Sequence, residues 1–205
     1  GAALVAAWLG GAPPARALEW SIRTFEADIT VQERGALQVQ ERIEVEFEVP
    51  KHGIYRDIPV HYNVRAGFAH DLRLTVESVV DLAGHVLPYQ ARRQGRNVHI
   101  RIGDPDRTVE GLQTYVLRYR VRNGVDFHAD HDELYWNVTG DAWPVPIEAA
   151  RLSVRWVQPL PADRLTAEVY TGAYGERGRD AVAVPTPEGF AAHTTRPLGA
   201  WEGLT

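Results

Sequence analysis

The stretch of residues 37–49 constrains the fold more than any other part of this chain, because apolar and polar side chains alternate along its whole length. A period of two is typical of a β-strand with one face buried and the other in water. The inward positions are Leu37, Val39, Glu41, Ile43, Val45, Phe47 and Val49. Only Glu41 interrupts this otherwise apolar series. The sequence therefore predicts a long amphipathic strand with one carboxylate on its buried face.

The same alternation precedes this stretch. Apolar residues occupy every second position of residues 25–31, and residues 33–36, which read Glu-Arg-Gly-Ala, provide a turn. Two alternating runs joined by a short turn indicate a β-hairpin. We therefore expect residues 25–31 and 37–49 to pair, with their apolar side chains on a shared inward face.

Shorter runs with a period of two continue to the end of the chain. They cover residues 72–76, 98–102, 115–121, 134–138 and 152–156, with weaker candidates at 165–170, 181–184 and 190–194. The dipeptide Asn123-Gly124, which follows one of these runs, is typical of a hairpin turn. No apolar period of 3.6 extends over more than about ten residues, so we expect about nine or ten strands and little helix. This pattern predicts an all-β fold, an antiparallel two-sheet β-sandwich of the Ig-like or a related Greek-key type.

Charged side chains predict one specific strand pairing. Glutamates occupy every second position of residues 44–48, and arginines occupy every second position of residues 118–122. Opposite charges on neighbouring strands are favourable by about 0.2–1 kcal/mol per pair, whereas like charges in one row repel each other. We therefore expect these two strands to be neighbours, with glutamate opposite arginine.

Residues 1–17 resemble the rear half of a signal peptide. An apolar run is followed by glycines and prolines and then by Ala15-Arg16-Ala17, whose small residues suit cleavage after Ala17. The alternative is an uncleaved N-terminal anchor, and either segment would export the remainder. We therefore expect residues 18–205 to form a single β-sandwich ectodomain that is cut short ahead of transmembrane segments.

Composition excludes several classes of function. The chain has no Cys, which rules out thiolate zinc sites, thiol nucleophiles and disulfides. Its 22 basic and 27 acidic residues are mixed along the chain and give a net charge of −5, so no basic face is expected for nucleic acid. Serine is scarce and occurs in no Gly-x-Ser-x-Gly elbow, which argues against a serine hydrolase.

Two motifs and the opening strand carry a family resemblance. Residues 51–59 read KHGIYRDIP, residues 130–147 read DHDELYWNVTGDAWPVPI, and residues 23–31 read RTFEADITV. Together they resemble the bacterial family of predicted membrane proteins called domain of unknown function 2207. The resemblance implies an extracytoplasmic N-terminal domain at the bacterial plasma membrane, attached through transmembrane segments outside this fragment. It brings no established activity and no catalytic residues.

The densest group of metal-binding side chains lies in residues 128–133, which read His-Ala-Asp-His-Asp-Glu. Two imidazoles and three carboxylates in so short a segment suit a divalent cation such as zinc, manganese or calcium. The spacing matches no established metal motif, and acidic loop residues are also commonly solvated or cap backbone N–H groups. The candidate metal ligands are His128, Asp130, His131, Asp132 and Glu133.

A second candidate site is a binding surface around Tyr55, Arg56 and Asp57, which lie in an expected loop between strong strands. Arg56 has two interpretations: a bidentate partner of a carboxylate that fixes the path of the chain, or an exposed group that binds an anionic envelope ligand. Among the tryptophans, Trp136 and Trp156 share strand faces with apolar residues and are expected in the core. Trp143 lies beside two prolines and is expected to be exposed, which adds it to the candidate binding residues.

The leading interpretation of function is a non-enzymatic binding or assembly module of a membrane-anchored bacterial envelope protein, with no cofactor or, as the alternative, a divalent metal. Its expected partner is another envelope protein or a cell-wall polymer. The alternative is a metal-dependent envelope hydrolase that uses the loop of residues 128–133. Elemental analysis is the first test of the alternative, because the hydrolase requires stoichiometric metal and the binding module does not require it.

Overall fold

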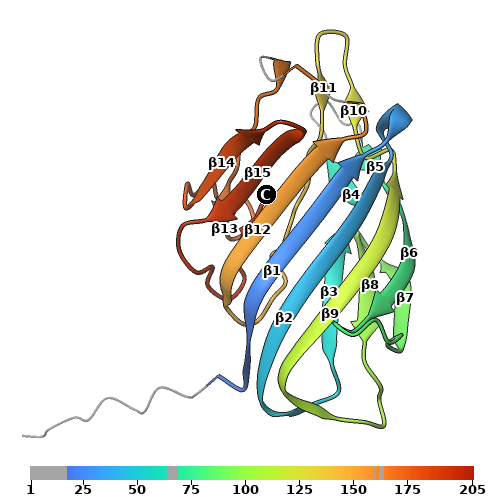
Figure 1. Ribbon diagram of the computed structural model, residues 1–205, viewed down its shortest axis with the longest axis vertical. Coiled ribbons are helices and arrows are strands. Elements are labelled where there is room, and N and C mark those ends of the chain that lie inside the picture. The colour runs from blue at the N-terminus through green and yellow to red at the C-terminus, as the bar shows by residue number, and fades with distance from the viewer. Residues whose placement is uncertain (1–17, 64–68, 159, 162–163) are drawn as a thin grey trace, which may run out of the picture.

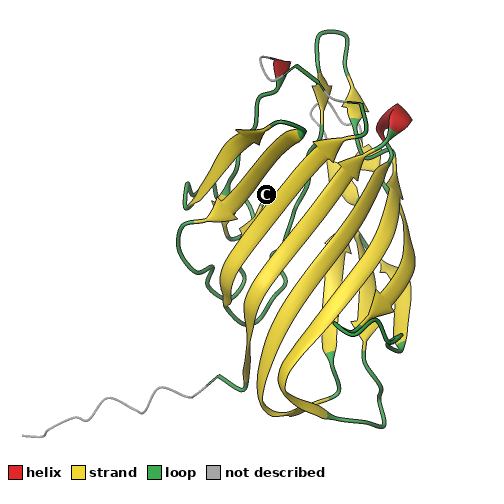
Figure 2. Ribbon diagram, in the orientation of Figure 1, coloured by secondary structure: helices red, strands yellow, loops and turns green. Residues whose placement is uncertain are grey.

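The computed structural model describes residues 18–63, 69–158, 160–161 and 164–205. Strand makes up 58% of the structure and helix 2%, which confirms the all-β prediction (Figure 2). The helical part includes the short 3-10 turn η1 (Glu33–Gly35). Within the described ranges, no helix has the length and apolar character that crossing a membrane requires. The expected signal segment, residues 1–17, lies outside the described residues.

A seven-stranded sheet forms the larger layer of the fold, in the order β14-β15-β12-β1-β2-β9-β6 (Figure 1). Its strands are β1 (Trp20–Val31), β2 (Leu37–Lys51), β6 (Arg73–Val80), β9 (Val109–Arg122), β12 (Ile147–Trp156), β14 (Ala181–Thr186) and β15 (Gly189–Thr194). β1 and β2 form the predicted hairpin around η1, with Ile29 opposite Val39. The pleat turns the apolar side chains of β2 inward from Leu37 to Phe47, both at most 1% exposed, whereas Val49, which was expected on the same face, is 38% exposed.

A three-stranded sheet, β3-β8-β7, forms the second layer and packs against the inner face of the first (Figure 1). It consists of β3 (Ile54–Pro59), β7 (Tyr89–Gln94) and β8 (Asn97–Ile102). Ile58, Ile100 and Ile102 are fully buried and share one hydrophobic core with β1 and β2, as the predicted sandwich requires. Three two-stranded ribbons also occur: β4 (His61–Asn63) with β5 (Ala69–Asp71), β10 (Asp126–Phe127) with β11 (Asp132–Glu133), and β13 (Thr171–Gly172) with β16 (Gly203–Leu204).

One pair of neighbouring strands, β1 and β12, is parallel and so departs from the predicted antiparallel arrangement. After β9 the chain passes through β10 and β11 and returns through the irregular backbone of residues 134–146, so β12 starts at the same end as β1. Ion pairs on the outer face join the two strands. Arg23 binds Glu148 at 2.6 Å, and Arg151 binds Glu26 at 3.0 Å.

Two of the predicted strands are wrong, because residues 134–138 and 165–170 have irregular backbone. Near Val138 the backbone groups find partners outside a sheet ladder. The N–H of Val138 donates to the carbonyl of Leu204 at 2.8 Å, and the carbonyl of Val138 accepts a hydrogen bond from Arg56. With its polar backbone satisfied in this way, the segment can be buried without forming a strand.

The predicted hairpin turn at Asn123-Gly124 is a turn, but it does not join two paired strands. Asn123 has a left-handed backbone with φ 59°. The N–H of Gly124 donates to the carbonyl of Gly35 at 2.9 Å, and the next strand, β10, pairs with β11. The turn therefore directs the chain away from β9.

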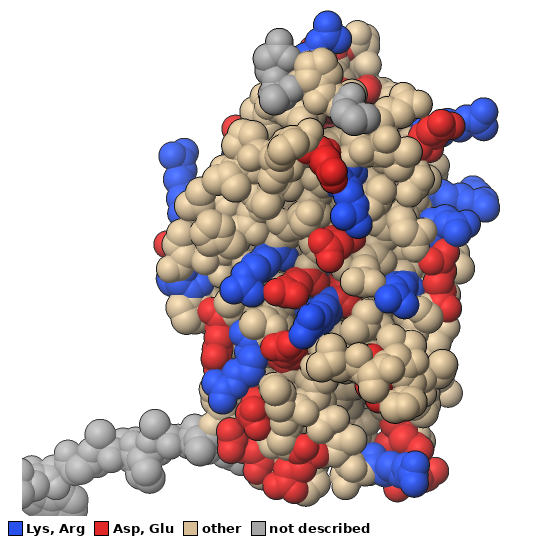
Figure 3. Space-filling view, in the orientation of Figure 1, with Lys and Arg blue, Asp and Glu red and all other residues tan. Residues whose placement is uncertain are grey.

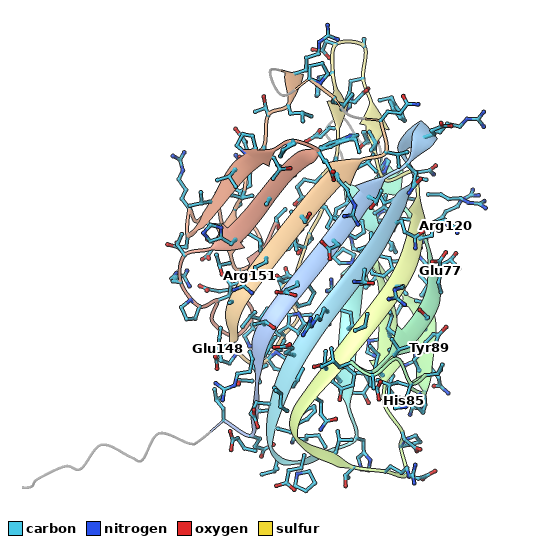
Figure 4. All side chains as sticks on the ribbon, in the orientation of Figure 1. Glu77, His85, Tyr89, Arg120, Glu148 and Arg151 are labelled. Atoms are coloured by element: carbon cyan, nitrogen blue, oxygen red, sulfur yellow. The ribbon has the colours of Figure 1, made fainter. Side chains whose placement is uncertain are left out.

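β2 and β9 are neighbours, as the charged stripes predict, but their register differs from the prediction. Arg120 lies opposite Gln38, and Glu44 lies opposite Thr114. Arg120 instead binds Glu77 of β6 at 2.9 Å (Figure 4). Burying one large apolar side chain is worth about 1.5–3 kcal/mol, against about 0–1 kcal/mol for an exposed ion pair, so packing sets the register. Charges of both signs consequently interleave over the outer face of the large sheet (Figure 3).

Candidate functional site

Arg56, which lines the candidate site, forms a buried ion pair with Glu41. The two residues occupy inward positions of β2 and β3, and their exposed fractions are 0% and 1%. The expectation that residues 55–57 lie in a loop is wrong, because they belong to strand β3. Arg56 Nε donates to Glu41 Oε2 at 2.8 Å, and Arg56 Nη2 donates to Glu41 Oε1 at 2.7 Å. The interpretation of Arg56 as a bidentate partner of a carboxylate is confirmed, and the interpretation as an exposed side chain is wrong. The carboxylate that interrupts the apolar face of β2 has its partner on the opposite layer.

The remaining donors of Arg56 bind backbone carbonyls. Nη1 donates to Asp57 O and to Thr139 O, both at 2.8 Å, and Nη2 donates to Val138 O at 2.9 Å. The guanidinium also lies over the ring of Phe25, 5.2 Å from its centroid. All five N–H donors of the guanidinium are thus used, so Arg56 has none left for a ligand. Its role is to hold β3 against residues 138–139.

The electrostatics of this pair are coupled to Tyr119. The Tyr119 hydroxyl donates to Glu41 Oε1 at 2.7 Å. Burial lowers the pKa of Arg56, but the adjacent Glu41 carboxylate and its hydrogen bonds raise it by more, so that the pKa lies above its ordinary value. Burial, and then the charge of Glu41, raise the pKa of Tyr119 well above its usual range. Arg56 and Tyr119 therefore both keep their protons over the physiological pH range.

Trp143 is buried, at 3% exposure, so the prediction that it is exposed is wrong. Its indole N–H donates to the carbonyl of Thr139 at 2.7 Å, which satisfies the only polar group of the ring inside the protein. Its ring packs edge-on against Trp20 and Phe25, with centroids 6.4 and 6.3 Å away. Trp136 is 5% exposed, which confirms its place in the core.

The four predicted binding residues line one cavity of about 260 Å³. The complete lining is Trp20, Tyr55, Arg56, Asp57, His99, Ala142, Trp143, Pro144 and Trp201. We call it the aromatic pocket. Arg56 and Trp143 are buried members of this lining, whereas Tyr55 and Trp201 are 58% and 55% exposed. The structure thus brings the four predicted residues to one cavity, with Arg56 and Trp143 buried and Tyr55 exposed.

One wall of the aromatic pocket is the outward face of β3 and β8. The Tyr55 ring stacks on the His99 ring with centroids 5.1 Å apart and an interplanar angle of 22°. His99 Nδ1 lies 2.7 Å from Asp57 Oδ1, and the two residues are cross-strand partners. This wall offers an aromatic face beside a carboxylate and an imidazole.

The lining also includes Trp201, which sequence reasoning missed. Its backbone is left-handed, with φ 66°, a conformation that bulky side chains rarely adopt. Its N–H donates to the carbonyl of Trp143 at 2.8 Å. The signal in the sequence was the pair Gly199 and Gly203 on either side, which marks a turn but does not place the indole.

Glu202 closes the turn that presents Trp201. Its carboxylate accepts hydrogen bonds from the N–H of Gly199 and from Arg196 Nη1, both at 2.7 Å. The Arg196 hydrogen bond and the Gly199 N–H hold the pKa of Glu202 below its ordinary value. Arg196 also binds Asp180 at 2.9 Å, which ties the turn to the segment before β14. These contacts fix the backbone that carries the exposed Trp201 side chain.

A larger hollow of about 530 Å³ lies between β6 and β7, and arginines line part of it. They are Arg73, Arg92 and Arg93, of which Arg93 is paired with Asp71 at 2.7 Å. None of the predicted binding residues lines this hollow. The aromatic pocket, with its buried floor and its exposed rings, is the better candidate for a specific ligand.

The predicted metal ligands lie in β11 and in the loop that joins it to β10. Ligating atoms of His128, His131 and Glu133 all lie within 4.8 Å of one another, and the three residues are exposed. Asp130 is hydrogen-bonded to His131 Nδ1 at 2.9 Å, which makes it a neighbour of the group. Asp132 does not belong to the group. The structure therefore brings together three of the five predicted residues, with a fourth beside them.

Comparisons with known proteins show the fold and the family. Leukotriene A4 hydrolase from Saccharomyces cerevisiae has a similar structure, with a TM-score of 0.54 and 9% identity over 91% of this chain and 28% of that one. Its complex with bestatin gives a TM-score of 0.53 at 10% identity, over 94% of this chain and 31% of that one. At such identity the likeness shows the fold alone.

The uncharacterized protein YciQ of Escherichia coli (strain K12) is 29% identical over 165 residues, which are 79% of this chain and 26% of that protein. The chain thus spans about a quarter of that relative's length. Residues 21–204 match the N-terminal domain of the predicted membrane proteins named DUF2207. This match covers nearly the whole chain, and the protein therefore belongs to the DUF2207 family of predicted membrane proteins.

Proposed function

We propose that this domain is a non-enzymatic binding module on the extracytoplasmic side of the bacterial plasma membrane. Membership of a family of predicted membrane proteins supports attachment to a membrane. The signal-like sequence of residues 1–17 supports export of the domain. The anchor itself is assigned to parts of the full-length protein that lie outside this chain.

The ligand is a saccharide unit of a cell-wall polymer, bound in the aromatic pocket. Tyr55 and Trp201 carry this proposal, because they expose large aromatic rings at the rim of one cavity. The apolar face of a sugar ring stacks on such rings, and its hydroxyls bond to groups such as the Asp57 carboxylate and the His99 imidazole. The cavity of about 260 Å³ is slightly smaller than a typical small-molecule pocket, which suits one sugar unit of a longer chain.

The backbone of Trp201 gives independent support. A non-glycine residue in the left-handed region costs about 1–3 kcal/mol and persists only where the surroundings enforce it. Here the strain holds an indole partly in water, where it contributes little to the core. Strain of this kind is concentrated at ligand-binding sites, because a fixed side chain loses little freedom when a ligand binds.

Co-sedimentation with purified cell-wall sacculi tests the proposal. The wild-type chain should sediment with sacculi from which proteins have been stripped, and Trp201→Ala and Tyr55→Ala should each weaken binding by at least about tenfold. Tyr174→Ala is the matched control, because Tyr174 is an 85% exposed ring that does not line the pocket. The proposal fails if stripped sacculi bind no protein or if Tyr174→Ala weakens binding as much. Binding only to unstripped sacculi would identify a protein partner and overturn the saccharide assignment.

A further inference from the structure

The ribbon of β10 and β11 places three metal-binding side chains on one of its faces. Asp126 is paired with Glu133, and the N–H of His128 donates to the carbonyl of His131 at 2.9 Å, which continues the ladder. His128 and His131 are therefore cross-strand neighbours, and the pleat puts Glu133 on the same face as His131. The two imidazole rings are nearly parallel, at 24°, with centroids 4.7 Å apart.

Asp130 orients one of these imidazoles. Its carboxylate accepts the hydrogen bond of His131 Nδ1 at 2.9 Å, which leaves the lone pair of the ring on Nε2. A carboxylate on the non-ligating nitrogen of a histidine is the usual outer support of a metal ligand.

The base of the ribbon is fixed to the rest of the protein although its tip is exposed. His70 Nδ1 lies 2.6 Å from Asp126 Oδ1. A Cβ atom at Gly35, in η1, would lie 3.0 Å from Val125 and 3.1 Å from Phe127, which shows how closely the turn and the ribbon pack. The backbone on one side of the ligating residues is therefore fixed by these contacts, and it loses little conformational freedom when a cation binds.

We infer that this face of the ribbon is a zinc site, with His128, His131 and Glu133 as ligands and Asp130 as the group that orients His131. Two imidazole nitrogens with one carboxylate match the preference of zinc, whereas calcium and magnesium prefer all-oxygen sets. Three protein ligands leave the fourth tetrahedral position open to water or to a ligand from a partner. The site is separate from the aromatic pocket and does not depend on the function proposed for it.

Isothermal titration of the chelator-treated full chain with zinc tests the inference, and cobalt absorption reports the geometry. We expect one equivalent of zinc to bind, and His128→Ala and His131→Ala each to weaken binding at least about tenfold. Asp130→Asn should weaken binding by about 10–100-fold and keep the stoichiometry, because it removes an orienting group and no ligand. Tetrahedral cobalt should give strong visible absorption bands that His131→Ala abolishes.

His85→Ala is the matched control. His85 is exposed and its Nδ1 lies 2.9 Å from Asp81, so it repeats the imidazole–carboxylate pair without the second imidazole. This variant should bind zinc like the wild type. The inference is overturned if zinc does not bind below on the order of 100 μM, or if His85→Ala loses as much affinity as His131→Ala. Binding of His131→Ala to sacculi should be unchanged, which separates this test from that of the aromatic pocket.

Discussion

Glu41 and Arg56, on opposite layers of the sandwich, form a bidentate ion pair from which water is excluded. We expect Arg56→Lys to lower the free energy of unfolding by about 3–5 kcal/mol, because one ammonium cannot replace both hydrogen bonds to Glu41 and those to three carbonyls. Urea denaturation measures the change. Arg93→Lys at the exposed pair with Asp71 is the control, and its midpoint should stay at the wild-type value. Equal losses in the two variants would show that burial of the pair contributes nothing.

Tyr119→Phe should destabilise the domain by about 1.5–3 kcal/mol, because it removes a buried hydrogen bond to the charged Glu41. Tyr115→Phe is the matched control on the same strand. Tyr115 is 4% exposed, and burial alone raises its pKa to about 12. Its loss of stability should stay within about 0.5 kcal/mol. Thermal denaturation of the two variants distinguishes the outcomes, and a larger effect at Tyr115 would contradict the proposed network.

Trp201→Gly should be more stable than Trp201→Ala by about 1–2 kcal/mol, since only glycine adopts a φ of 66° without steric cost. Both variants lose the indole, so both should bind sacculi equally weakly. The difference in stability between the two variants therefore measures backbone strain, whereas their shared loss of binding measures the contribution of the indole to ligand binding. If alanine is as stable as glycine in chemical denaturation, the backbone at Trp201 is not strained.

The Trp201 turn should loosen in acid. The folded-state pKa of Glu202 lies below its ordinary value of 4.5, so the ionised carboxylate stabilises the turn. This contribution is complete above pH 4.5 and is lost as the pH falls through the lower, folded-state pKa. The amide proton of Gly199, which donates to Glu202, should report the transition by NMR. Glu202→Gln should abolish it, and a wild-type midpoint at or above 4.5 would refute the assignment.

The layers of the fold were predictable from the sequence because they depend on local alternation. The β1–β2 hairpin needs only two runs of period two and a turn, and all of these lie within residues 20–51. The register of β2 against β9 was not predictable from charge. The inward side chains of both strands set it, and exposed ion pairs are too weak to shift it.

The candidate site was predictable only in part. Alternation identified Glu41 as the one carboxylate on an apolar strand face but assigned it no partner, and Arg56 was expected to pair with an unnamed carboxylate. Trp143 was assigned to the surface because its neighbours are prolines, but its indole N–H finds the carbonyl of Thr139 inside the protein. At Trp201 the flanking glycines marked only a turn, because the exposure of the indole depends on how Glu202 and Arg196 hold that turn through side-chain contacts.

The parallel pairing of β1 with β12 also determines the order in which the chain can fold. Arg23 and its partner Glu148 are 125 residues apart, whereas β1 and β2 form a local hairpin. Until the chain beyond residue 147 has been synthesised, β1 has one unsatisfied edge at the centre of the future sheet. Strand pairings between residues distant in sequence form slowly, and the unpaired edge of a strand can pair with strands of other chains. A nascent or truncated chain that ends before β12 should therefore self-associate, which light scattering would detect, and the domain can close only after most of it has been synthesised.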